Sequence, residues 1–288
     1  MVRIVTGEWL AKTAAKDFET FFLPGQKIDV RIDIASINFP CIRTNSAGSR
    51  IIIPREMAAD RIEDAANFFF HLLMVSHEIA HLVHKHTLAG RQENADHMAL
   101  EYWADFYGAK VMMTLVTHGG GVSELFREFY PGESVFDEAL TSIGDAVGRL
   151  VTNVYADNAR YPSKLLRVAL TCNGISSFLR HLYASISQTT GRTATAKWYL
   201  QVFNRVFSAP SVRELMLLSP ESAAFDPEPI ERSRAWHREM QGEGVAITPG
   251  FWPDFLVYLH TSFDQTDEER AMSEAMRVAE FRQAGLID

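Results

Sequence analysis

The segment from Arg61 to His86 constrains the fold most, because it contains neither proline nor glycine and is apolar on nearly every face. A helix that is hydrophobic all round is normally buried, so the sequence predicts a core helix around which other elements pack. Gly90 is its natural end. Five of the chain's ten histidines lie in this segment, at positions 71, 77, 81, 84 and 86. Buried imidazoles need hydrogen-bond partners or a metal ion, so the segment is also the first place to look for a functional site.

The sequence before this segment predicts one helix and two strands. Residues 8–22 have a helical pattern that ends at a proline and a glycine. Residues 27–39 alternate apolar with charged side chains, which is typical of a half-buried strand. Residues 48–54 are rich in β-branched side chains and predict a second, short strand.

The sequence after the segment predicts mainly helices. A second long helix should begin near Asn94 or Asp96 and continue past Met113. Later helices should be separated by breaks at residues 118–121, 131–134, 160–163, 208–211, 225–229 and 247–253. We therefore predict an α+β fold, with a small mixed or antiparallel sheet packed on a helix pair and a mainly helical C-terminal half. Residues 1–115 would carry the sheet and both site helices, and residues 116–288 would complete a cleft; a single domain is the alternative.

Composition excludes several classes of protein. The net charge of -8 argues against nucleic acid as a partner, because such surfaces normally carry a basic stripe. The two cysteines, Cys41 and Cys172, form no C-x-x-C motif, so neither a disulfide framework nor a thiolate metal site is expected. The start of the chain lacks an apolar signal core, and no stretch approaches the roughly 20 apolar residues of a membrane helix. We expect a cytoplasmic protein that does not insert into membranes.

The core segment contains the pattern H-E-x-x-H, formed by His77, Glu78 and His81. Four residues is slightly more than one helical turn, so both imidazoles leave the same face and can meet at one zinc ion. Glu78 is placed beside them to take a proton from metal-bound water. The alternative is a pair of histidines packed in a helical core without metal.

The other histidines of this segment fit a metal site less well. His84 lies on the same face, but its backbone is about 10 Å along the axis from that of His77, too far for one tetrahedral ion. His71 and His86 point elsewhere by the helical count of 100° per residue. The metzincin pattern is rejected, because it needs a glycine at position 84 and a histidine where this chain has Thr87.

A better third ligand comes from the next predicted helix. Four polar residues recur there every four positions and form one stripe: Glu93, His97, Glu101 and Asp105. Such a stripe is usually a solvated face. Beside two candidate histidines, however, a carboxylate from this helix would complete a His2Glu zinc site and leave the fourth position open for water. Asp105 could then accept a hydrogen bond from the far nitrogen of a ligand histidine and fix its tautomer.

At these residues the chain resembles a known group. The segments "HEIAH" and "EYWADFYGA" are similar to the two motifs of the gluzincin metallopeptidases, most closely the CAAX prenyl proteases, heat-shock membrane proteases and soluble minigluzincins. The resemblance covers roughly residues 44–110. It implies a zincin-like fold in which one zinc ion is bound by His77, His81 and Glu101. It also implies that Glu78 is the general base and that Asp105 supports a ligand histidine.

The same group suggests two further parts of a site. Residues 44–54 resemble the strand that precedes the catalytic helix, where an extended peptide substrate pairs with the strand edge. That likeness implies substrate binding by the backbone of Arg50, Ile51, Ile52 and Ile53. The group's later H-P-x-x-x-x-R motif recurs here without its histidine, at Tyr161 to Arg167 and at Asp226 to Arg232. We favour Tyr161 and Arg167, because a tyrosine hydroxyl can donate to an oxyanion and an ionised aspartate cannot; the alternative is an ordinary helix start.

Together the two motifs predict a zinc metallopeptidase, an endopeptidase that hydrolyses a protein substrate with water activated by Glu78. The Lit-type phage-exclusion peptidases are similar in size and share H-E-x-x-H, so phage defence or stress regulation is one expected setting. One alternative is a non-catalytic or regulatory zinc-binding protein that binds a partner through its helical half. Another is an ImmA-type protease that cleaves a repressor.

Overall fold

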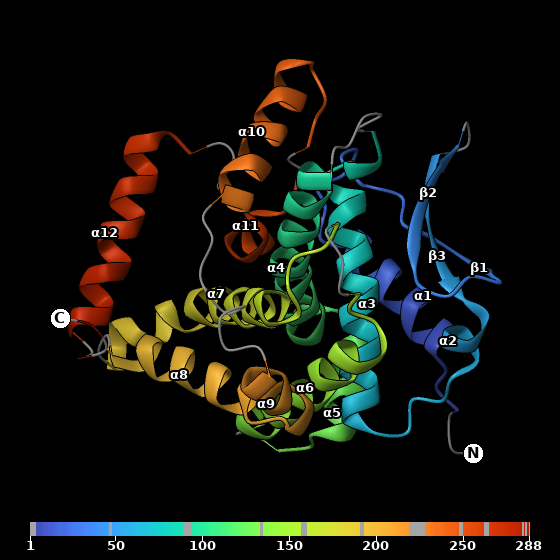
Figure 1. Ribbon diagram of the computed structural model, residues 1–288, viewed down its shortest axis with the longest axis horizontal. Coiled ribbons are helices and arrows are strands. Elements are labelled where there is room, and N and C mark those ends of the chain that lie inside the picture. The colour runs from blue at the N-terminus through green and yellow to red at the C-terminus, as the bar shows by residue number, and fades with distance from the viewer. Residues whose placement is uncertain are drawn as a thin grey trace.

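The computed structural model describes residues 4–45, 48–88, 94–132, 135–156, 160–190, 193–218, 228–247, 250–261, 265–283, 285 and 287. This part of the chain is mainly helical, with a small mixed sheet at one side (Figure 1). The predicted α+β composition is thereby confirmed. None of the described helices is both long and apolar enough to cross a membrane. Gly90, Glu93, Asp226 and Pro227, which the sequence predictions used, lie outside the described residues.

The sheet has three strands in the described residues, β1 (Arg31–Ala35), β2 (Cys41–Asn45) and β3 (Gly48–Pro54). Their order is β1-β3-β2, so β3 is central; it runs parallel to β1 and antiparallel to β2. The strand predicted at 27–39 is therefore shorter than expected. The sequence reasoning missed β2, whose five residues lack a clear apolar alternation. The outer strand β2 is the one that lies toward the functional site described below.

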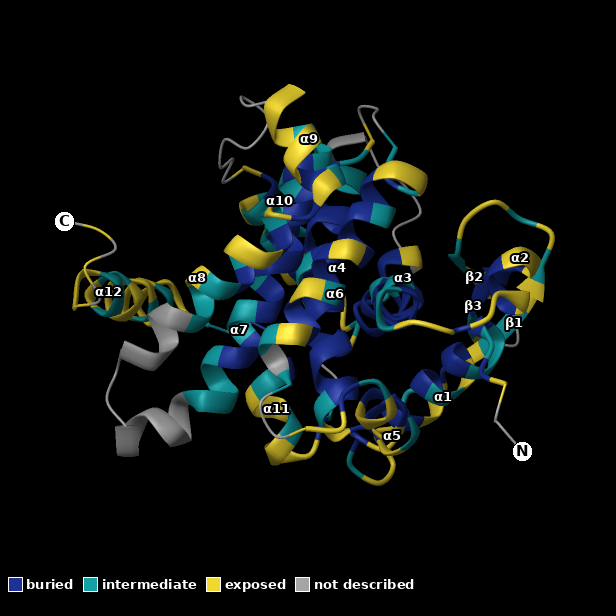
Figure 2. Ribbon diagram, turned by 90° about the horizontal axis from the view of Figure 1, so that it is seen from below, coloured by how far each residue is buried: buried dark blue, intermediate teal, exposed yellow. Residues whose placement is uncertain are grey.

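The helix α3 (Ala65–Val83) is the predicted core helix. It begins after Asp64, whose side chain accepts a hydrogen bond from the backbone N–H of Asn67 at 2.6 Å and so caps the helix. Its apolar side chains are buried on several faces, among them Phe68, Phe69, Leu72, Val75, Ile79 and Val83, and Figure 2 shows the helix enclosed by its neighbours. No residue of α3 is exposed, and only one stripe, which includes Phe70, Met74, His77 and His81, is partly accessible, so the predicted core helix is confirmed.

The end of α3 differs from the prediction. The helix stops at Val83, and His84 caps it with its backbone N–H bonded to the carbonyl of Ala80 at 3.1 Å. Lys85 then has a φ of 53°, a left-handed conformation in which the chain cannot continue as an α-helix. The short 3-10 helix η1 (His86–Leu88) follows. The reversal at Lys85 turns the side chain of His86 back toward α3. The helical count of the sequence prediction had placed this side chain on another face.

The helix α4 (Asn94–His118) lies beside α3 and begins and ends as predicted (Figure 1). The two helices approach closely at Gly108. A Cβ atom at this position would lie 2.9 Å from both the Cα and the backbone nitrogen of His77, which is closer than packed carbon atoms allow. The absence of a side chain at Gly108 therefore fixes the distance between the helices at the first histidine of the motif.

The remaining helices enclose this pair. In chain order the others described are α1 (Gly7–Glu19), α2 (Arg55–Ala59), α5 (Gly120–Phe129), α6 (Phe136–Asn153), α7 (Lys164–Thr190), α8 (Thr193–Phe207), α9 (Pro210–Leu218), α10 (Glu228–Gly242), α11 (Pro253–Leu259) and α12 (Asp267–Gln283). One hydrophobic core runs from α1 through α3, α4, α6 and α7 to α11. The boundary predicted between residues 115 and 116 lies inside α4.

We expect Gly108→Ala to destabilise the protein by about 1–3 kcal/mol, because the added methyl group overpacks the contact between α3 and α4. The gain in helix propensity, up to about 1 kcal/mol, offsets part of this cost. Urea unfolding measures the difference. The matched control is Gly242→Ala at the end of α10, where a Cβ atom meets no heavy atom within 4 Å and stability should not fall. Equal stability of the two variants would contradict the close approach at Gly108.

Candidate metal centre

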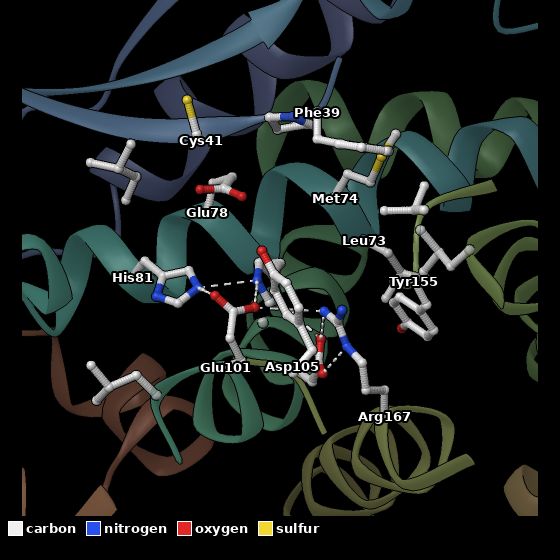
Figure 3. A pocket seen from close by; sticks show the side chains of 18 of the residues that line it. Phe39, Cys41, Leu73, Met74, Glu78, His81, Glu101, Asp105, Tyr155 and Arg167 are labelled. Carbon is white, nitrogen blue, oxygen red and sulfur yellow. Dashed lines mark hydrogen bonds and ion pairs between the residues drawn. The ribbon is translucent and has the colours of Figure 1, made fainter. Parts of the chain in front are cut away.

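Three potential ligands meet between α3 and α4. The Nε2 atoms of His77 and His81 lie 3.1 Å apart. The carboxylate of Glu101 faces both, with Oε2 at 3.2 Å from His77 Nε2 and Oε1 at 3.3 Å from His81 Nε2. Figure 3 shows Glu101 rising from α4 toward His81 on α3. This group of three side chains could hold a metal ion.

The two imidazole nitrogens are spaced like two ligands of a tetrahedral ion. With ligand bonds of about 2.0–2.1 Å, two corners of a tetrahedron lie roughly 3.3 Å apart. The two Nε2 atoms, 3.1 Å apart, are close to that edge length, and each lies at a similar distance from a different oxygen of Glu101, 3.2 Å for Oε2 and 3.3 Å for Oε1. Two ring nitrogens and a carboxylate oxygen all present lone pairs when the histidines are neutral, and such atoms repel one another unless a cation or a proton lies between them.

The outer nitrogen of His77 is held by a buried ion pair. Its Nδ1 lies 3.0 Å from Asp105 Oδ1. Arg167, from α7, donates to both oxygens of Asp105, from Nε to Oδ2 at 2.7 Å and from Nη2 to Oδ1 at 2.9 Å. Burial alone would raise the pKa of Asp105, but Arg167 and His77 hold it below its usual value. An ionised Asp105 accepts the Nδ1 proton of His77 and so turns the Nε2 lone pair toward the metal position.

The outer nitrogen of His81 is held differently, by another histidine. His81 Nδ1 lies 2.7 Å from Nδ1 of His86, the residue that the left-handed turn brings back toward α3. The prediction that His86 points away from the site is therefore wrong. His84 does stay out of the ligand group, since its Nδ1 bonds the carbonyl of Ala80 at 3.0 Å. His71 bonds Asp60 at 2.8 Å instead.

Glu78 is almost buried and lines the same cavity as the three ligands. In Figure 3 its carboxylate lies between the ligand group and Cys41 of β2. Burial raises the pKa of Glu78 above its ordinary value, although the neighbouring histidines act in the opposite direction. A carboxylate with a raised pKa accepts a proton more readily at neutral pH, which is the property that a general base requires.

The cavity has a volume of about 530 Å³. Its polar wall contains Tyr161 and His97 beside Glu101, with the rings of Tyr161 and His97 packed edge to face at 5.2 Å. His97 donates from Nδ1 to the carbonyl of Arg160 at 2.9 Å. The apolar wall is formed by Phe39, Ile42, Leu73, Met74, Leu150, Val154 and Tyr155. The cavity thus offers both a polar and an apolar surface next to the ligands.

The two residues predicted at the oxyanion occupy different positions. Arg167 is buried, its guanidinium lies 4.0 Å from the centre of the Tyr155 ring, and two of its nitrogens bind Asp105. Its contacts give it the role of holding Asp105, and its action on an oxyanion stays a prediction. Tyr161 has its ring at the cavity wall, 5.5 Å from the Arg167 guanidinium. Burial raises the pKa of Tyr161, so its hydroxyl keeps its proton and can donate.

The substrate role predicted for Arg50, Ile51, Ile52 and Ile53 needs correction. These residues belong to β3, which is paired with β1 on one side at all four positions and with β2 on the other at the first three. A central strand has no free edge to pair with a peptide. Cys41 and Ile42 of the outer strand β2 line the cavity instead. The sequence pattern could not show this, because strand order depends on contacts with β1.

Three contributors to the site were not assigned a role from sequence. His86 was excluded by helical arithmetic that fails beyond Val83. His97 was recognised only as part of a polar stripe. His237, on α10, lies 3.1 Å from His86 between their Nε2 atoms and is separated from it by 151 positions in the chain. No local motif marks His237, so only the folded structure reveals it.

The chain was compared with protein-family models, with curated proteins and with solved structures, and none of these comparisons gave a significant match.

Metal binding should depend steeply on pH. Burial alone would lower the pKa of His77, but its hydrogen bonds with Asp105 and Glu101 raise it to about 10. Without metal, His77 therefore carries a proton at neutral pH, and this proton must leave when the metal binds. We expect release of about one proton from His77 per ion near pH 8, with affinity rising about tenfold per pH unit. Calorimetry in buffers of different ionisation enthalpy measures the release, and an affinity independent of pH from 7 to 9 would contradict the assignment.

Proposed function

We propose that this protein is a zinc-dependent metallopeptidase with a zincin-like site, which hydrolyses peptide bonds of a protein substrate. The observation that supports this most is that His77, His81 and Glu101 meet in the cavity that Glu78 also lines. Two imidazoles and one carboxylate form a set used by catalytic zinc, with the fourth position open. A zinc ion there would lower the pKa of water and polarise the substrate carbonyl.

The protein's own residues supply the remaining steps of the proposed reaction. Glu78 takes a proton from the attacking water and passes it to the leaving nitrogen of the cleaved bond. The hydroxyl of Tyr161 donates a hydrogen bond to the oxygen that gains negative charge during attack. Asp105, held by Arg167, keeps His77 oriented throughout.

The cavity favours an extended peptide as substrate. β2 is an edge strand of the described sheet and contributes Cys41 and Ile42 to the cavity, so its outer edge could pair with an extended backbone, as sheet edges do in peptide recognition. The apolar wall, which includes Leu73, Met74 and Val154, would then receive an apolar side chain next to the cleaved bond. We therefore propose a protein substrate with an apolar residue at the cleavage site. A host protein or a transcriptional repressor would meet this requirement if the cleaved segment is extended.

One feature supports a second candidate, a non-catalytic metal-binding protein that acts through a partner. The helix α12 has no buried residue, and the side chains of Met272 and Met276 on it are exposed by 63% and 56%. Exposed methionines are common at protein-binding surfaces. This candidate keeps the metal centre but gives Glu78 no chemical role.

The substitution Glu78→Gln separates the two candidates. We expect it to lower the rate of substrate cleavage by about 10²- to 10⁴-fold, the usual contribution of a general base, while metal content and unfolding are unchanged. Substrates are found by comparing the cleaved peptides of cells that express wild type or the variant. The matched control is Glu63→Gln, at an exposed carboxylate outside the cavity. If wild type and Glu78→Gln generate the same cleaved peptides, the peptidase proposal fails and the partner-binding candidate gains support.

A further inference from the structure

Three histidines, of which His86 and His237 are buried, form a continuous line from α3 to α10. His81 Nδ1 lies 2.7 Å from His86 Nδ1, and His86 Nε2 lies 3.1 Å from His237 Nε2. The line ends at a backbone carbonyl, because His237 Nδ1 lies 2.6 Å from the oxygen of Ser233. His86 is 3% exposed and His237 is fully buried, so bulk water does not reach the contacts between them.

The direction of every hydrogen bond in this line follows from its last member. A carbonyl oxygen can only accept, so His237 must donate to Ser233 from Nδ1. A neutral His237 then has a lone pair on Nε2 and accepts from His86 Nε2. His86 in turn has its lone pair on Nδ1 and accepts from His81 Nδ1. The one nitrogen of His81 left without a proton is Nε2, which faces Glu101 and His77.

The surroundings of His237 keep it neutral. Its ring packs against Trp236 at 5.0 Å and Trp103 at 5.8 Å between ring centres, and the indole of Trp236 also covers His86 at 5.4 Å. Burial lowers the pKa of His237 to about 3. A neutral imidazole has a single N–H, so the line of bonds has one consistent arrangement of protons.

We propose that His86 and His237 are positioning residues that, with the Ser233 carbonyl, hold His81 in the Nδ1–H tautomer with its Nε2 lone pair aimed at the metal. This inference rests on the proposed metal site. It assigns to the C-terminal region, through α10, a direct part in building the centre. It also predicts that His86 has the opposite tautomer, protonated at Nε2, from His81 and His237.

The two ligand histidines would then be supported by different chemistry. His77 donates to a carboxylate, whose negative charge strengthens the imidazole as a ligand. His81 donates to a neutral ring, which fixes its orientation with a smaller effect on its basicity. Removing the support of His81 should therefore weaken metal binding by loss of orientation and tautomer, while the ligands themselves remain.

A pair of substitutions at His237 tests this role. His237→Leu removes the acceptor for His86, and we expect zinc to bind about 10- to 100-fold more weakly, the usual cost of losing a partner of a ligand histidine. His237→Gln restores an acceptor, because its side-chain oxygen lies as many bonds from Cβ as Nε2 does, and should recover most of the loss. The dissociation constant is measured with Zn²⁺ against a chromophoric chelator. His118→Leu, on α4 but outside the cavity, is the control for removing a histidine.

If His237 only fills space in the core, the two variants should rank in the opposite order, with His237→Leu binding zinc more tightly than His237→Gln. An apolar pocket accepts leucine better than glutamine, because a buried amide without suitable partners is costly. Zinc affinity that is equal in both variants, or higher in His237→Leu than in His237→Gln, would overturn the inference. If the wild-type protein binds no Zn²⁺, both the proposed function and this inference fail. If the wild-type protein binds Zn²⁺ and both variants bind it equally well, only the positioning role of His86 and His237 fails.

The wild-type protein offers a second test that needs no substitution. Correlation of imidazole ¹⁵N and ring ¹H signals in the zinc-loaded protein reports which nitrogen of each histidine carries the proton. We expect Nδ1–H for His81 and His237 and Nε2–H for His86. A His86 protonated at Nδ1 in the zinc-loaded protein would contradict the proposed line of bonds, whatever the stability of the variants.

Discussion

The contact between the backbones of α3 and α4 at Gly108 is the constraint on which the rest of the site depends. A glycine there lets α4 approach to within van der Waals distance of the His77 backbone, so Glu101, two turns earlier on α4, reaches both imidazoles of α3. A wider separation of the two helices would move the Glu101 carboxylate out of reach of the His77 and His81 imidazoles. The apolar faces of both helices keep this separation fixed, because they are buried in one hydrophobic core.

Each candidate ligand histidine contacts a different part of the chain through its outer nitrogen. Arg167 of α7 holds Asp105, which holds His77. His237 of α10 holds His86, which holds His81. Helices that follow α4 in the sequence therefore contact the partners of the candidate ligands from outside, although these ligands all lie before residue 102. The sequence motifs occupy less than one third of the chain. The C-terminal helices nevertheless shape the site, through Arg167 and His237.

The sequence predicted those parts of the structure that local pattern determines. The apolar run of α3 predicted a buried helix, and the H-E-x-x-H spacing with Glu101 predicted three groups that do meet in space. The errors occur where tertiary contacts decide. Lysine gives no local signal for a left-handed turn, so the return of His86 after Lys85 was missed. The central position of β3 and the contact between His86 and His237 depend on partners distant in sequence.

X-ray absorption at the zinc edge, on protein loaded with one equivalent of Zn²⁺, tests the central claim most directly. The account predicts four nitrogen or oxygen ligands at about 2.0–2.1 Å, with outer-shell scattering from two imidazoles and no sulfur. Failure to retain zinc would contradict the account. So would scattering from three or more imidazoles, because the structure assigns His84 and His86 other bonds and leaves His77 and His81 as the histidine ligands.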